Sequence, residues 1–198
     1  MLKCAIAVAG LTASLFSAPF VAPAAADDTA PTRVEVKTVL GSGCPDGSAN
    51  VRMTSANRFV ISFSDFAAWT GAGESETNTR KNCQVALEVD APEGATYSIN
   101  RTTYRGFTYL SSAGSATASA QYYCQGSSDT KTATIKAFTG PTRAEWTSSA
   151  TSGASASVRC QPNRLLNVNT ELRVSPSPTD AFGVLGLESL EGTVTVNR

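Results

Sequence analysis

The sequence contains no histidine. Histidine is the side chain that most often acts as a general base near neutral pH, and it is the most frequent protein ligand of metal ions. Its absence makes a Ser-His-Asp triad impossible. Enzyme mechanisms are narrowed to carboxylate pairs, Ser/Lys arrangements or an imported cofactor, and no pattern in the residues indicates a cofactor. A non-enzymatic function is therefore favoured over an enzymatic one.

An excess of charge of either sign is also missing, because 16 basic residues balance 16 acidic residues. Proteins that bind nucleic acid usually carry a basic face, so we expect no nucleic-acid partner.

One long apolar run is present, and it lies at the start of the chain. It follows Lys3, contains Pro19 and ends on the small residues Ala24, Ala25 and Ala26. This three-part pattern is typical of a secretory signal peptide and not of a membrane span. We expect residues 1–26, Cys4 included, to be removed. Residues 27–198 are then predicted to form a single secreted domain with no membrane anchor.

Four cysteines follow residue 26: Cys44, Cys83, Cys124 and Cys160. An even number in an exported chain indicates disulfide bonds, and four cysteines allow three pairings. Pairing in sequence order would close two loops of similar length. The spacings are wide and include no C-x-x-C pair, so we expect no metal site. Oxidised cysteines would also exclude catalysis by a thiolate.

Apolar residues recur at every second position in five segments, which is the period of a half-buried strand. The predicted inward-facing sets are Val34, Val36, Thr38 and Leu40; Ala49, Val51 and Met53; Phe59, Ile61 and Phe63; Val85, Leu87 and Val89; and Leu166, Val168, Thr170, Leu172 and Val174. No segment has a sustained helical period.

Turn residues separate these runs at 44–47, 90–94, 140–141 and 175–178. Residues 70–82 form the longest polar loop. The Ser/Ala/Gly-rich tracts 111–120 and 147–157 are interpreted as long connections or weak edge strands. Short strands separated by frequent turns predict an all-β fold, an antiparallel β-sandwich or a barrel-like double sheet with two disulfides.

Aromatic residues supply the candidate binding site. Exposed rings on a rigid sheet can stack against sugars or anchor a protein interface, although the same rings can equally fill a core. Tyr122 and Tyr123 are adjacent, so one must face each way on a strand. We also consider YRGF at 104–107 as a recognition turn. The candidate binding residues are Trp69, Tyr104, Arg105, Phe107, Tyr109 and Trp146.

The leading hypothesis is a non-enzymatic module that binds an extracellular polysaccharide or protein. Two alternatives are a glycoside hydrolase that uses two carboxylates and a protease inhibitor that uses the loop 70–82. The candidate carboxylates are Asp65, Asp129, Glu145 and Glu171. Their spacing selects no pair, and we expect Glu171 to be solvated or paired with Arg173 or another cation. Glu74 and Glu76 lack the spacing of an EF-hand calcium loop.

Seven short motifs in order resemble a family of secreted bacterial and fungal proteins known as domain of unknown function 4360. They are GSGCP (41–45), FSDF (63–66), RKNCQ (80–84), YRGF (104–107), YY (122–123), FTGP (138–141) and NVNTELRV (167–174). The resemblance implies a secreted β domain and supplies no activity. Family members generally end with one further cysteine, which is missing here, whereas Cys124 stands where an aromatic residue is expected. The resemblance therefore implies that Cys124 partners Cys160.

Overall fold

The alternating segments fold into antiparallel strands that form two stacked sheets. The structure is a computed structural model that describes residues 33–151, 158–175 and 182–197. Its strands are β1 (Arg33–Leu40), β2 (Ala49–Ser55), β3 (Arg58–Phe63), β4 (Ala67–Thr70), β5 (Arg80–Asp90), β6 (Thr96–Leu110), β7 (Ser115–Cys124), β8 (Thr130–Thr139), β9 (Thr142–Thr151), β10 (Leu166–Ser175) and β11 (Gly183–Asn197). A single 3₁₀ turn, η1 (Glu76–Thr79), precedes β5. In the described part of the chain, no helix is long and apolar enough to cross a membrane.

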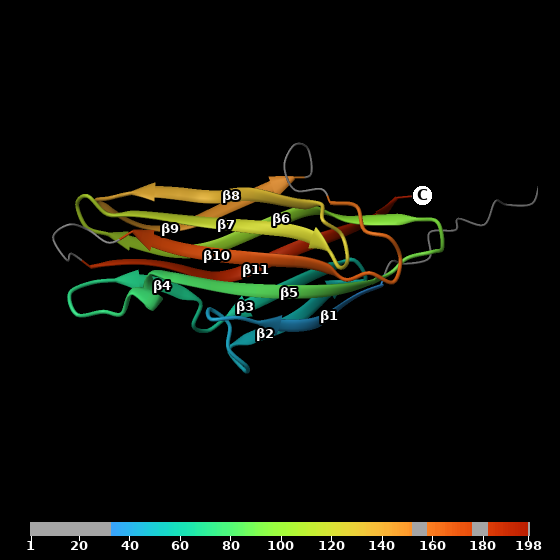
Figure 1. Cartoon of the computed structure of the whole chain (residues 1–198), viewed down its shortest axis with the longest axis horizontal. Coiled ribbons are helices and arrows are strands. Elements are labelled where there is room, and N and C mark those ends of the chain that lie inside the picture. The colour runs from blue at the N-terminus through green and yellow to red at the C-terminus, as the bar shows by residue number, and fades with distance from the viewer. Residues whose placement is uncertain (1–32, 152–157, 176–181, 198) are drawn as a thin grey trace, which may run out of the picture. The chain divides into compact units, whose positions relative to one another are not determined.

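Two sheets lie face to face in Figure 1. The sheet nearer the viewer, here called the front sheet, has the strand order β1-β5-β10-β7-β8. The back sheet has the order β2-β3-β11-β6-β9, with β4 paired to β11 beyond the end of β3. These sheets confirm the predicted all-β fold and decide for a sandwich.

The core lies between the sheets and is formed by alternate residues of both. Three of the predicted inward-facing sets are buried at most positions, namely those of β3, β5 and β10. In β10 all five predicted positions from Leu166 to Val174 are buried. The back sheet contributes mainly through β6 and β11, which pair from Gly183 opposite Leu110 to Asn197 opposite Thr96.

Both disulfides join cysteines in sequence order, as expected. Cys44, in the turn after β1, is bonded to Cys83 of β5. Cys124, at the end of β7, is bonded to Cys160, which precedes β10. All four cysteines are buried in the core. In the chain-entropy model, loops of this length contribute about 3–4 kcal/mol of stability each.

Two predicted strand faces are wrong. In β1 the pairing with β5 shifts between Val36 and Thr38, so Val39 packs against the core and Leu40 is 57% exposed. Such a bulge adds one residue to one strand and reverses the alternation beyond it. In β2 both Val51 and Met53 are exposed, because β2 is an edge strand of the back sheet.

The connections also differ from the predicted ones. The tract 111–120 enters β7, which lies between β10 and β8 inside the front sheet and is not an edge strand. Its alanines Ala116, Ala118 and Ala120 are buried in the core. Residues 147–151 belong to edge strand β9, and residues 152–157 lie outside the described residues. The loop predicted at 70–82 is shorter, since Thr70 ends β4 and Arg80 begins β5. The expected signal peptide and most of the turn at 175–178 also lie outside the described residues.

Candidate binding surface on the back sheet

Strand β6 places its second half in strict alternation between the core and the solvent. Tyr104, Thr108 and Leu110 are buried, whereas Phe107 and Tyr109 are exposed. The interpretation of 104–107 as a recognition turn is therefore wrong, because these residues lie within a strand. Gly106 faces the core, where a Cβ atom would lie 2.0 Å from the carbonyl oxygen of Gly186. Only glycine allows this close approach of β6 to β11.

Two of the six candidate residues are in the core. Tyr104 is 1% exposed, and its hydroxyl is hydrogen-bonded to the Tyr122 hydroxyl at 2.8 Å. Burial raises the pKa of Tyr104 well above its ordinary value, and the neighbouring Tyr122 raises it further. Trp146 of β9 is 5% exposed, and its ring centroid lies 5.8 Å from that of Phe138. Neither side chain can touch an external ligand in this structure.

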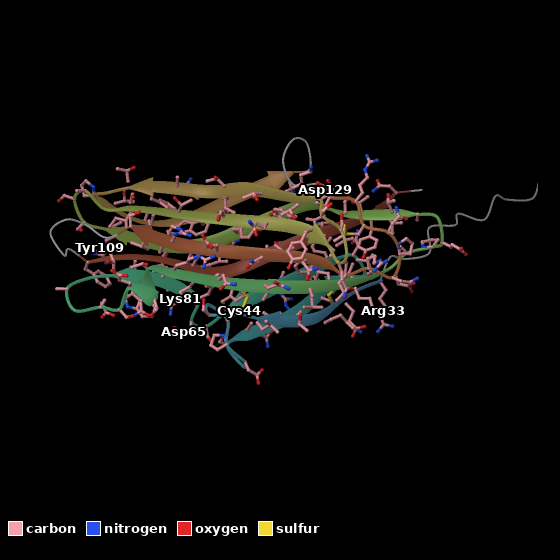
Figure 2. The ribbon with its side chains drawn as sticks, in the orientation of Figure 1. Arg33, Cys44, Asp65, Lys81, Tyr109 and Asp129 are labelled. Carbon is pink, nitrogen blue, oxygen red and sulfur yellow. A yellow bond between two sulfur atoms is a disulfide. The ribbon has the colours of Figure 1, made fainter. Side chains whose placement is uncertain are left out.

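Three aromatic rings on the outer side of the back sheet face solvent. Phe107 is 38% exposed, Tyr109 is 42% exposed and Phe182 is 51% exposed. The Phe107 ring lies over Gly186, since a Cβ atom there would come 2.3 Å from Phe107 Cε1. The centroids of Tyr109 and Phe182 are 6.0 Å apart with the rings tilted by 38°. We call these three residues the aromatic face. Figure 2 places Tyr109 at the opposite end of the strands from Arg33 and Asp129.

Charged side chains flank the aromatic face. Arg143 of β9 is directly opposite Tyr109, and Glu145 is directly opposite Phe107. Arg105, one of the predicted residues, is exposed and donates from Nη1 to Thr147 Oγ1 at 3.4 Å. Two open depressions lie beside Tyr109, and Tyr109 and Arg143 line both of them. Hydrogen-bonding groups are thus placed beside the exposed rings.

Trp69 lies one strand further along the same sheet but has partners within the chain. It is opposite Val184, which is itself opposite Tyr109, so the three side chains share one side of the sheet. Its Nε1 donates to Glu74 Oε2 at 2.9 Å, and Lys81 Nζ lies 5.0 Å from its ring centroid. Trp69 is half-buried, so it borders the aromatic face with one edge engaged by the loop.

Glu74, in the loop between β4 and β5, also has hydrogen-bond partners within the chain. Besides Trp69, its Oε2 accepts a hydrogen bond from Asn78 Nδ2 at 3.1 Å. Within the described ranges, no group of three or more Cys, Asp or Glu residues is placed to hold a metal ion.

The four candidate carboxylates lie on different elements. Asp65 lies between β3 and β4, Asp129 between β7 and β8, Glu145 on β9 and Glu171 on β10. Asp65 and Asp129 are well separated in Figure 2, and Asp129 is ion-paired with Lys131. None of the four is directly opposite another across a strand pair.

Glu171 is held by two cations, as expected for Arg173 or another cation. Arg80 Nε donates to Glu171 Oε2 at 2.6 Å, and Arg173 Nη2 donates to Oε1 at 3.0 Å. Burial alone would raise the pKa of Glu171, but the hydrogen bonds and charges of the two arginines outweigh it and lower the pKa. A general acid requires a raised pKa, so Glu171 is unsuited to that role.

Two residues of this surface were not found from the sequence. Phe182 precedes β11 and Arg143 lies on β9, far from Tyr109 along the chain. Both meet Tyr109 only because β6 pairs with β11 on one side and with β9 on the other. No local periodicity carries that information.

A family model described as a domain of unknown function, DUF4360, matches residues 30–197. The chain belongs to the DUF4360 family. An uncharacterized secreted protein of Arthroderma benhamiae is 28% identical over 167 residues, which cover 81% of this chain and 67% of that protein. The family resemblance is thus confirmed, and this DUF4360 chain is a secreted protein with a domain of unknown function.

Among solved structures, TmCBM61 in complex with beta-1,4-galactotriose is similar with a TM-score of 0.32 and 12% identity. The similarity covers 85% of the DUF4360 chain and 89% of the other chain. A similarity of this size supports no conclusion about ligand or function.

Proposed function

We propose that this protein is a non-enzymatic extracellular module that binds a neutral polysaccharide on its aromatic face. The observation that carries the proposal is the exposure of three neighbouring rings, with Phe107 and Tyr109 on β6 and Phe182 just before its partner strand β11. Large rings are costly to leave in water, and a group of them on a monomer surface is a common mark of a binding site.

The chemistry of the surface fits a sugar chain. The apolar C–H faces of sugar rings stack on aromatic rings, while their hydroxyls need donors and acceptors at the edge of the stack. Arg105 and Arg143 supply donors, and Glu145 supplies an acceptor. Because strand pairing on both sides fixes β6, little conformational entropy is lost when the ligand binds.

The arrangement also favours a slender ligand over a broad protein partner. A standard protein interface buries about 800 Å² on each side. Here the charged residues Arg143 and Glu145 of β9 border the exposed rings along one side, which limits the apolar area there. The two depressions on either side of Tyr109 would hold neighbouring sugar units of one chain.

The test is depletion of the exported protein from solution by insoluble cellulose, chitin, xylan and galactan. We expect retention on at least one polymer, with the dissociation constant raised about tenfold by Tyr109→Ala, which corresponds to about 1.4 kcal/mol. Phe107→Ala should weaken retention in the same direction. Leu40→Ala is the matched control, because Leu40 is an exposed apolar residue on the front sheet.

Two results would contradict the proposal. One is that no polymer retains the wild-type protein. The other is retention that Tyr109→Ala and Phe107→Ala leave unchanged while circular dichroism shows both variants folded.

A further inference from the structure

The outer side of the front sheet carries polar side chains in register across four strands. In one row Gln84, Asn169, Gln121 and Thr132 lie directly opposite one another in turn. The next row is Asn82, Glu171, Ser119 and Thr134. Neighbouring strands are about 4.8 Å apart and alternate residues along a strand about 6.8 Å apart, so the side chains form a regular grid. We call these eight residues the polar face.

The polar face is almost free of charge. Glu171 is its one ionisable residue, and that carboxylate is ion-paired with Arg80 and Arg173, which lie opposite each other in the row beyond it. Protein surfaces usually carry many charged residues of both signs, and asparagine is depleted in strands. Asn82 and Asn169 nevertheless occupy neighbouring strands within the sheet. Residues that contradict local propensity in this way are expected at functional sites.

Hydrogen bonds orient the amides in advance. Ser42 Oγ donates to Asn82 Oδ1 at 3.1 Å, and Asn82 Nδ2 donates to Asn169 Oδ1 at 3.4 Å. This chain ends at Asn169 Nδ2, which has no acceptor among the described residues. The amide of Gln121 directly opposite likewise has no hydrogen bond within the described part of the chain. Free donors and acceptors are therefore concentrated at the centre of the polar face.

A second hydrogen bond fixes Gln84. Its Nε2 donates to Oδ1 of the buried Asn167 at 3.3 Å, and Asn167 Nδ2 donates in turn to the Leu165 carbonyl at 3.4 Å. Asn167 is thus a positioning residue that directs the amide of Gln84. The side chains of the polar face do not have to be ordered by a ligand, which lowers the entropic cost of binding.

Two segments that carry the family resemblance meet here. RKNCQ at 80–84 and NVNTELRV at 167–174 pair antiparallel as parts of β5 and β10. Their inward residues, such as Cys83, Val168 and Leu172, are accounted for by the disulfide and the core. Their outward residues have no role in the core or at the aromatic face.

We propose that the polar face is a second binding surface, which recognises the hydroxyl edges of a neutral polysaccharide. Amide groups both donate and accept hydrogen bonds, and so do sugar hydroxyls, whereas charged side chains offer only one of these. Tyr123, two residues from Gln121 on the same side of β7, borders the polar face with a half-buried ring. The eight residues themselves present only polar groups, so the ligand meets them with its hydroxyls. This site lies on the other sheet from the aromatic face and does not depend on it.

The experiment is nuclear magnetic resonance of the isotope-labelled exported protein titrated with cellohexaose, chitohexaose and xylohexaose. It is carried out on wild type and on the Phe107→Ala/Tyr109→Ala variant, so that binding at the aromatic face is removed from the measurement. We expect at least one sugar to shift the side-chain amide signals of Asn169 and Gln121 in both proteins.

A variant of the polar face provides the second arm. Asn169→Ala/Gln121→Ala should raise the dissociation constant that the shifts on β7 and β10 report at least tenfold. Asn50→Ala removes an exposed amide on edge strand β2 and should leave that constant unchanged. Absence of shifts on β7 and β10 with all three sugars would overturn the proposal. An unchanged dissociation constant for the folded Asn169→Ala/Gln121→Ala variant would also overturn it. Neither result bears on the aromatic face, which the wild-type shifts on β6 report separately.

Discussion

Strand β6 carries aromatic side chains on both of its sides, and the two sides serve different purposes. On the inner side, Tyr104 is buried, and its hydroxyl is hydrogen-bonded to the Tyr122 hydroxyl of the facing sheet. One and three residues further along, Arg105 and Phe107 point to solvent with no sheet above them. The same residue types stabilise the fold on one side and offer a surface on the other. The role of a ring depends on which side of the sheet its position in the strand faces and on whether the other sheet covers that side.

The test with the largest expected effect truncates one ring on each side of the back sheet, the buried Trp146 of β9 and the exposed Tyr109 of β6. Trp146→Ala should lower the free energy of unfolding by about 3–5 kcal/mol, because it leaves a cavity beside Phe138. Tyr109→Ala should lower it by no more than about 0.5 kcal/mol, since an exposed ring contributes little to packing. Urea unfolding of the two variants measures both values.

Trp146→Phe is the control for this test. The Trp146 Nε1 group is buried without a hydrogen-bond partner in the described residues, so replacing the indole by a smaller ring loses packing but no hydrogen bond. Its destabilisation should fall well below that of Trp146→Ala. A Tyr109→Ala variant as unstable as Trp146→Ala would show that the aromatic face belongs to the core.

A second test uses alkaline pH, which acts on the buried tyrosines of the inner side. Burial and the charge of Glu88 raise the pKa of Tyr97 to about 12, and burial also raises the pKa of Tyr104 and of Tyr122. Above about pH 10 the unfolded chain loses these protons while the folded chain keeps them. The free energy of unfolding must then fall as the pH rises, by up to about 1.4 kcal/mol per pH unit for each such tyrosine.

The measurement is chemical unfolding at pH 9, 10 and 11. Tyr97→Phe should reduce the steepness of the decline between pH 10 and 11 and leave the stability change between pH 7 and 9 as in wild type. An equal slope in the variant and the wild type would mean that Tyr97 ionises in the folded protein as readily as in the unfolded chain.

The contrast between covered and exposed strand sides also explains how much of the structure could be predicted from the sequence. The alternation from Leu166 to Val174 identified a buried strand correctly, because the strand is regular and has neighbours on both sides. The alternation in β1 failed at Leu40, because an extra residue in the strand reverses the faces and leaves no mark on the composition. The disulfide pairing followed from the family resemblance. Phe107 and Tyr109 of the aromatic face were among the predicted binding residues. Phe182 and the neighbouring Arg143 could not be predicted, because they reach Tyr109 through non-local strand pairing.

The smallest expected effects come from removing single hydroxyls within the core. Tyr104→Phe deletes the 2.8 Å hydrogen bond to Tyr122, whose hydroxyl then keeps, among the described residues, only Thr102 Oγ1 at 3.4 Å. The free energy of unfolding should therefore fall by about 1 kcal/mol. Tyr97→Phe should change it at neutral pH by less than about 0.5 kcal/mol. The Tyr97 hydroxyl is buried without a hydrogen-bond partner among the described residues, and removing an unsatisfied polar group costs nothing. Urea unfolding at pH 7 compares the two variants directly. If Tyr97→Phe lowers the free energy of unfolding more than Tyr104→Phe does, the Tyr97 hydroxyl has a hydrogen-bond partner in solution, such as a buried water.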